Sequence, residues 1–140
     1  MTDIAPALLL DTCAMIFIGN ASGIDDAADR EIGRAATENR LFVSPMSAWE
    51  IGVGVAKGRL MLPLGPLEFF QRFLRLMKVQ LSALSAEILI GSSNLPGRLH
   101  GDPMDRILIS SARHLDMVLV TRDKPILDYG AEGHLRTLAC

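Results

Sequence analysis

The amino-acid sequence predicts an α/β domain, in which a doubly wound, mostly parallel sheet is flanked by helices. Short apolar runs typical of β-strands alternate along the chain with longer helical patterns, which is the signature of a parallel sheet. One of these runs, Leu8–Leu10, is entirely apolar and stops at Asp11, as expected for a strand buried on both faces. The length of 140 residues suits one domain, so residues 1–140 are expected to fold together.

The remaining elements follow from local signals. A short helix is expected after the first strand, with Thr12 as its cap, and Ser44 and Pro45 start a later helix that Gly58 ends. In chain order we expect helices over 12–18, 25–39, 45–57, 67–78, 85–94 and 103–114, and strands over 8–10, 41–43, 79–84, 117–121 and 135–138.

The helix expected over 67–78 has a wide apolar face. Its most prominent members are Phe69, Phe70, Phe73 and Leu74. The face can be core, because several phenylalanines lie near helices that must pack together, and this interpretation is favoured. Its width beyond one stripe also predicts a homodimer that uses the same side chains.

Composition excludes several classes of function. The 14 basic and 16 acidic residues give a net charge of −2, so no strong field draws the protein to nucleic acid or anionic lipid. Cys13 and Cys140 form no Cys-x-x-Cys pair, which argues against a disulfide framework or a cysteine zinc site and fits the reducing cytoplasm. Without a basic segment after Met1 or a long apolar run, we expect no signal peptide and no membrane span.

Four acidic residues are placed to meet at one edge of the predicted sheet. Asp11 directly follows the first strand, and Asp123 follows the 117–121 strand after one intervening residue. Asp105 lies in the first turn of the helix that leads into that strand, and Glu50 lies about one and a half turns into the helix after the second strand. Ligands of doubly wound sheets bind at this edge, where the strand order reverses.

Such a group of carboxylates favours a bound cation. Two like charges about 5 Å apart repel by roughly 3 kcal/mol at an effective dielectric constant near 20. A cation, or protonation of some of the acids, relieves this repulsion. Oxygen ligands without a His or Cys cluster point to Mg²⁺ or Mn²⁺, which suits phosphoryl chemistry.

Each acid also has a plain structural interpretation. Asp11 and Asp123 could be turn residues, and Glu50 could be a solvated helix residue. Asp102 precedes a proline and is predicted to be the N-cap of the 103–114 helix, which leaves Asp105 to face the crevice.

A group of basic residues flanks the third and fourth acids. The group could bind RNA phosphates or be an ordinary charged surface, and these two interpretations carry equal weight. Its members are Arg98, His100, Arg106, Arg122 and Lys124.

Several short motifs occur together in a characteristic order. They are Leu-Leu-Leu-Asp11-Thr12, Ser47-Ala-Trp49-Glu50-Ile51, the segment 57–63, Asp102-Pro-Met-Asp105-Arg106 and Val-Thr121-Arg-Asp123. The ordered set spans residues 7–129 and resembles PIN-domain nucleases, in particular the VapC-like toxins of type II toxin–antitoxin systems. The chain departs from its relatives at Gly101 and Met104, where they usually carry Arg and Phe. This difference affects possible contacts with RNA and leaves the four acids unchanged.

The resemblance implies a Mg²⁺-dependent endoribonuclease (Mn²⁺ being an alternative ion) that cleaves RNA by in-line attack of water. It further implies a homodimer and a small cognate antitoxin that blocks the acidic crevice. By position it implies Asp11, Glu50, Asp105 and Asp123 as catalytic acids, the three aspartates as metal ligands, and Thr12 and Thr121 as residues that hold waters or a carboxylate.

Two alternatives remain from other classes. A receiver-like signalling module would also place acids and Mg²⁺ at this edge, but no Asp follows the predicted 79–84 strand. A degenerate PIN domain that acts only as an interaction scaffold is disfavoured because all four acids are present.

Overall fold

A computed structural model describes residues 5–99 and 101–140 of the chain, which contain one five-stranded sheet. Every strand pairing in it is parallel, and the strand order is β3-β2-β1-β4-β5. The strands are β1 (Leu8–Leu10), β2 (Leu41–Val43), β3 (Gln80–Leu81), β4 (Val118–Thr121) and β5 (Thr137–Ala139). The prediction of a doubly wound parallel sheet is therefore confirmed.

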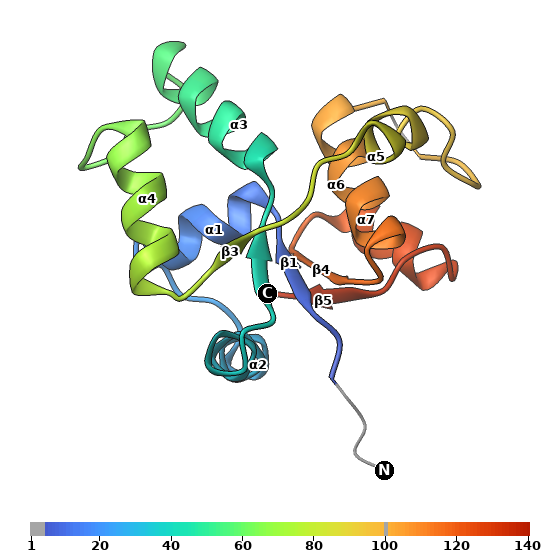
Figure 1. Cartoon of the computed structure of the whole chain (residues 1–140), viewed down its shortest axis with the longest axis horizontal. Helices are drawn as coiled ribbons and strands as arrows, with labels where there is room; N and C mark the ends of the chain where they lie inside the picture. Colours follow the sequence, from blue (N-terminus) through green and yellow to red (C-terminus); the bar gives the residue numbers. More distant parts are fainter. Residues whose placement is uncertain (1–4, 100) are drawn as a thin grey trace.

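Helices connect these strands and cover both faces of the sheet (Figure 1). They are α1 (Thr12–Gly19), α2 (Asp26–Thr37), α3 (Pro45–Ala56), α4 (Pro66–Leu76), α5 (Ala86–Gly91), α6 (Pro103–His114) and α7 (Lys124–Ala131). In Figure 1, α1–α4 lie on one side of β1 and α5–α7 on the other. None of the helices within the described ranges is long and apolar enough to cross a bilayer.

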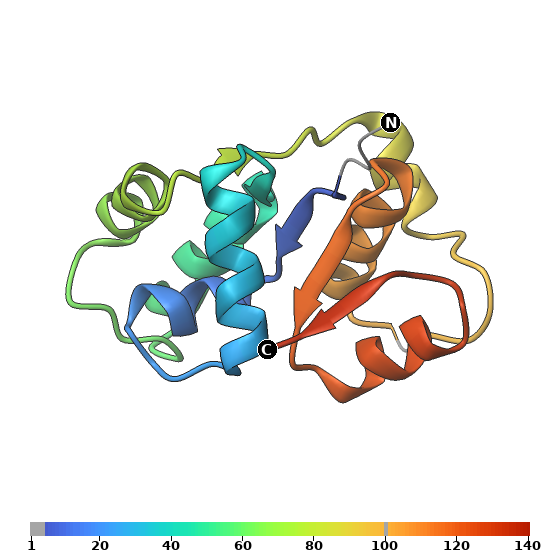
Figure 2. The ribbon, with the colours of Figure 1, turned by 90° about the horizontal axis from the view of Figure 1, so that it is seen from below.

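The strands divide the core into two apolar clusters, and Figure 2 shows helices on either side of the strands. Alternate residues of a strand point to opposite faces, so Leu8 and Leu10 belong to one cluster and Leu9 to the other. The first cluster packs under α1–α4, and the second packs under α6 and α7. Because both faces are covered, an entirely apolar strand is the sequence that this position requires.

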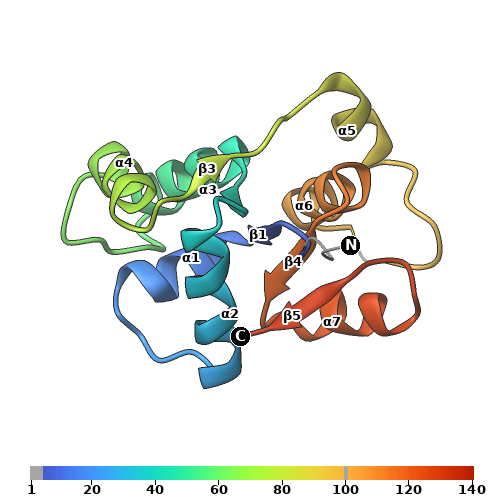
Figure 3. The same cartoon turned by 60° about the horizontal axis from the view of Figure 1, so that its bottom comes forward.

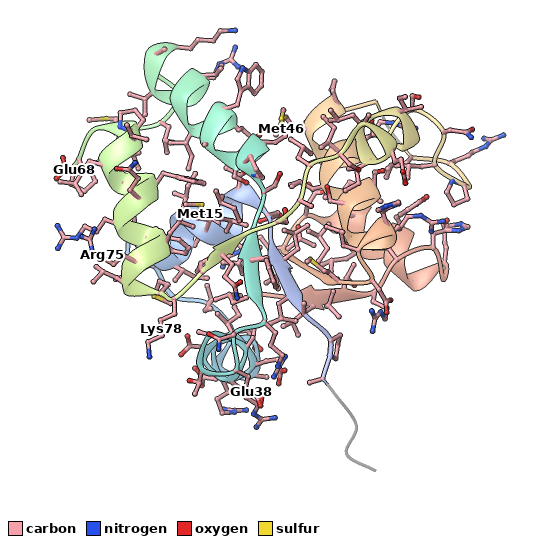
Figure 4. The ribbon with its side chains drawn as sticks, in the orientation of Figure 1. Met15, Glu38, Met46, Glu68, Arg75 and Lys78 are labelled. Atoms are coloured by element: carbon pink, nitrogen blue, oxygen red, sulfur yellow. The ribbon has the colours of Figure 1, made fainter. Side chains whose placement is uncertain are left out.

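The phenylalanines of α4 belong to the first cluster. Phe69, Phe70 and Phe73 are 5%, 6% and 4% exposed, which confirms that they belong to the core. These three side chains are therefore not available on the surface to form a dimer contact. Gly19 lets α4 approach α1, because a Cβ atom there would lie 2.6 Å from the Phe69 ring. In Figure 4 the labelled Glu68, Arg75 and Lys78 point outward, whereas Met15 lies inside.

Three local predictions were wrong. Asp11, and not Thr12, caps α1, because its carboxylate accepts the amide N–H of Ala14. The strand expected over 79–84 is only two residues long, since it is an exposed edge strand that pairs with β2 alone. The third is an omission, because no helix was expected after Asp123, although Pro125 lies in the first turn of α7, where proline is favoured.

Candidate active site at the carboxyl edge of the sheet

The site lies where the strand order reverses around β1. Leu10 is aligned with Val43 of β2 on one side and with Val120 of β4 on the other. The next residue, Asp11, donates its backbone N–H to the carbonyl of Val120 at 3.0 Å. This parallel register brings the ends of β1 and β4 together, so Asp11 comes next to the segment that leads to Asp123.

Three of the four predicted acids lie at the start of a helix. Asp11 caps α1 through a 2.7 Å hydrogen bond from the Ala14 N–H. Asp123 caps α7 by accepting the Ile126 N–H at 3.1 Å, and Asp105 lies in the first turn of α6. The positive end of each helix dipole stabilises the negative charge there, which helps the protein to tolerate neighbouring carboxylates.

Thr121, the last residue of β4, connects two of these acids. Its hydroxyl group donates a hydrogen bond to the Asp11 carboxylate. The same oxygen accepts the backbone N–H of Asp123 at 3.0 Å. Thr121 is fully buried, so one hydroxyl group holds the Asp11 side chain and the Asp123 backbone together.

The other predicted threonine, Thr12, has a different contact. Its hydroxyl group lies 2.9 Å from that of Ser47, and both residues are buried. Ser47 is in the first turn of α3, and Glu50 follows one turn later. The Thr12–Ser47 bond therefore links α1 to the helix that carries Glu50. Ser47 was not among the predicted site residues, although a hydroxyl residue three positions before Glu50 was a usable signal.

Two of the other predicted acids act electrostatically on Asp11. Burial raises the pKa of the Asp11 carboxyl above its ordinary value. Hydrogen bonds from Thr121 and Ala14 oppose this rise, and the charges of Glu50 and Asp123 add to it. Asp11 is 6% exposed, and the ionised carboxylate is therefore held in an environment that disfavours it.

The pKa of the Cys13 thiol is affected by the same four acids. The residue is exposed. Desolvation by neighbouring protein atoms is the largest cause that raises the pKa of its thiol to about 11, and the charges of Asp11, Glu50, Asp105 and Asp123 contribute the rest. All four acids therefore act on one point beside the start of α1.

The donor set fits a hard divalent cation bound through few protein ligands. Over residues 5–99 and 101–140, no three His, Cys, Asp or Glu side chains form a group that could hold a metal ion. Mg²⁺ usually binds to only one or two carboxylates and keeps several waters. The buried carboxylate of Asp11, on which the charges of Glu50 and Asp123 act, would supply one such ligand.

The predicted basic residues are mostly engaged within the protein. Arg106 donates to the carbonyl groups of Ser92 and Leu99 at 2.8 and 3.3 Å, which secures the segment before α6. Lys124 forms an exposed ion pair with Asp128.

The other three candidates differ from one another. Arg122 stacks on Phe17, and Arg98 is exposed. His100 lies outside the described residues.

Comparison with known proteins gives one family and 19 matching chains of solved structures, two of which are described below. The family model of the PIN domain matches residues 8–132. The VapBC2 complex of Rickettsia felis, bound to a DNA fragment from its promoter, matches with a TM-score of 0.68 and 18% identity, over 95% of this chain and 98% of that chain. DNA-bound VapBC from Salmonella typhimurium matches with a TM-score of 0.67 and 15% identity, over 96% and 98%. No curated protein shows a significant sequence match.

Proposed function

The chain belongs to the PIN domain family, and from this premise we propose that it is an endoribonuclease that requires Mg²⁺ or Mn²⁺. One observation carries the proposal: the buried carboxyl of Asp11 has a raised pKa and is faced by the charges of Glu50 and Asp123. A cation would relieve this repulsion and use the carboxylate oxygens as ligands.

The proposed ligands are Asp11, Asp105 and Asp123. When bound, the ion would activate water, orient the phosphate and stabilise the leaving oxygen. Thr121 keeps the Asp11 carboxylate turned toward the site through its hydrogen bond. Glu50, held by α3 through the Thr12–Ser47 contact, supplies a carboxylate that can take a proton from the attacking water.

We further propose that the protein is the toxin of a toxin–antitoxin pair. Support comes from the two structural matches, both of which are VapBC complexes that cover nearly the whole chain. The partner would be a small cognate antitoxin that blocks the acidic crevice. A homodimer stays a prediction, and its contacts would have to use residues other than the buried phenylalanines of α4. Light scattering that shows only a 15.2 kDa species at micromolar concentration would reject it.

The decisive experiment measures RNA cleavage by purified protein with Mg²⁺, with Mn²⁺ and with EDTA. We expect cleavage with either ion and none with EDTA. Asp11→Asn should be inactive, whereas Glu68→Gln, an equal loss of charge on the outer face of α4 (Figure 4), should be active. Undiminished cleavage in EDTA would overturn the proposed mechanism.

A further inference from the structure

We propose that Arg122 is a positioning residue, which holds the turn that carries Asp123 against the helix that Asp11 caps. The inference deepens the proposed function and rests on it. Arg122 was predicted as an RNA contact, yet its side chain is bound to three other parts of the protein.

The guanidinium group of Arg122 makes three contacts. Its central carbon lies 3.9 Å from the centre of the Phe17 ring in α1. Its Nη2 donates to the carbonyl of Gly23 at 3.4 Å, between α1 and α2, and the group also donates to the Cys140 sulfur at the end of β5. A planar guanidinium can stack on a ring and donate hydrogen bonds at the same time, which an ammonium group cannot match.

These three contacts are on the side of the protein where β5 ends. Figures 2 and 3 both show the end of the chain, marked C, beside the start of α2. The Cys140 N–H also donates to the carbonyl of Thr121 at 3.1 Å, so the backbone next to Arg122 is tied to β5 as well.

Arg122 lies between Thr121 and Asp123 in the chain. Its contacts therefore affect the position of the turn that carries Asp123. α1 begins after Asp11, and Phe17 follows six residues later, about 9 Å along the helix. The Arg122–Phe17 contact is therefore a second link between the β4–α7 turn and α1, separate from the hydrogen bond between Thr121 and Asp11.

A second link is needed to fix the distance between the two acids. The strand pairing and the Cys140–Thr121 hydrogen bond hold β4 as far as Thr121, but rotation of the backbone beyond that residue moves Asp123 relative to α1. The cap bond from Ile126 holds Asp123 only relative to its own helix. Two links well separated along α1 remove the rotation, and misplacement of a catalytic group by about 1 Å can lower a rate by about 100-fold.

The alternative role as an RNA contact makes different predictions. An arginine that binds a phosphate acts through its charge, so Arg122→Lys would keep most activity and losses would appear in KM. Phe17, which carries no charge, would not matter. A positioning role instead requires the ring of Phe17 and the planar shape of the guanidinium.

The test compares variants that remove or keep the aromatic ring of residue 17 with a variant that keeps the positive charge of residue 122. We expect Phe17→Leu and Arg122→Lys each to lower kcat about tenfold or more while KM changes by less than about threefold. Phe17→Tyr, which keeps the ring, should retain the wild-type kcat. Phe42→Leu is the matched control, because Phe42 is a half-buried phenylalanine of the second cluster, and it should also retain kcat.

Hydrogen exchange gives a readout that does not depend on activity. In Phe17→Leu the Asp123 amide, which is bonded to Thr121, should exchange about tenfold faster, and in Phe42→Leu it should not change. Wild-type kcat and wild-type exchange in Phe17→Leu would overturn the inference, as would an Arg122→Lys protein with normal kcat. If the wild-type protein cleaves no RNA, the proposed function fails, and the exchange rates still decide whether Arg122 positions Asp123.

Discussion

Thr121, the last residue of β4, donates a hydrogen bond to the carboxylate of Asp11, which directly follows β1 and lies far from Thr121 in the chain. The contact exists because β1 and β4 are neighbours in parallel register, with Leu10 opposite Val120. It orients a carboxylate whose pKa burial raises, and it partly offsets that rise.

Thr121→Val should therefore lower activity, although valine has nearly the same shape as threonine. Loss of the hydroxyl leaves the Asp11 carboxylate and the Asp123 N–H without this partner, at a cost of about 1–3 kcal/mol in the free energy of unfolding. We expect cleavage to fall at least tenfold and the acidic limb of the pH–rate profile to move to higher pH, because the Asp11 pKa rises further. Thr137→Val in β5 is the control, and unchanged cleavage in Thr121→Val would contradict this role.

Asp11→Asn should abolish cleavage without unfolding the protein. Asparagine caps helices as well as aspartate does, and it removes a buried charge. Because the folded pKa of Asp11 is raised, its ionisation lowers stability as the pH rises through the interval above the unfolded pKa. The metal-free variant should thus melt at the same temperature as the wild type or higher at pH 7, and this difference should disappear below about pH 4.

Metal binding provides a second comparison for the same variant. Mg²⁺ should raise the Tm of the wild-type protein, because a ligand that binds only the folded state stabilises it. The Tm of Asp11→Asn should respond much less. Equal Mg²⁺-induced shifts in thermal melts of the two proteins would rule out Asp11 as a ligand.

A substitution of Asp102 should mainly lower stability, whereas a substitution of Asp105 should mainly lower activity. Asp102 caps α6, with its carboxylate accepting the Met104 N–H at 2.9 Å and the Asp105 N–H at 3.4 Å. Asp102→Ala should cost about 1 kcal/mol of stability and reduce cleavage only modestly, whereas Asp105→Asn should lower cleavage by orders of magnitude with little loss of stability.

The matched control for the loss of a cap is Asp25→Ala at the start of α2, which should cost similar stability and leave cleavage intact. Thermal melts and RNA cleavage assays measure both effects. An Asp102→Asn protein that melts like the wild type but is as inactive as Asp105→Asn would show that Asp102 belongs to the metal site.

The reactivity of the Cys13 thiol should depend on the negative charge of the nearby acids. With a pKa of about 11, only about one thousandth of the thiol is ionised at pH 8, so iodoacetamide should react slowly. Asp11→Asn or added Mg²⁺ should speed the reaction, because each reduces the negative charge that raises the pKa. Measurements in a Cys140→Ser background isolate this thiol, and alkylation at the rate of a free thiol without metal would refute the prediction.

The sequence by itself determined where the strands and most helices lie along the chain, and it placed Asp11 and Asp123 just after two of the strands. These features depend on local signals: the apolar run before Asp11, the proline after Asp102 and the hydroxyl of Ser44 at the start of α3. A buried strand or a capped helix is recognisable from a few neighbouring residues.

Only the tertiary structure decided which side chains hold those acids in place. Thr12 and Ser47 are 35 positions apart, and Thr121 and Arg122 contact Asp11 and Phe17 from the first part of the chain. Such contacts depend on strand order and register, which no short segment encodes, because a side chain finds its partner only after separate elements have packed. For the same reason the exposure of Cys13 became evident only in the folded protein.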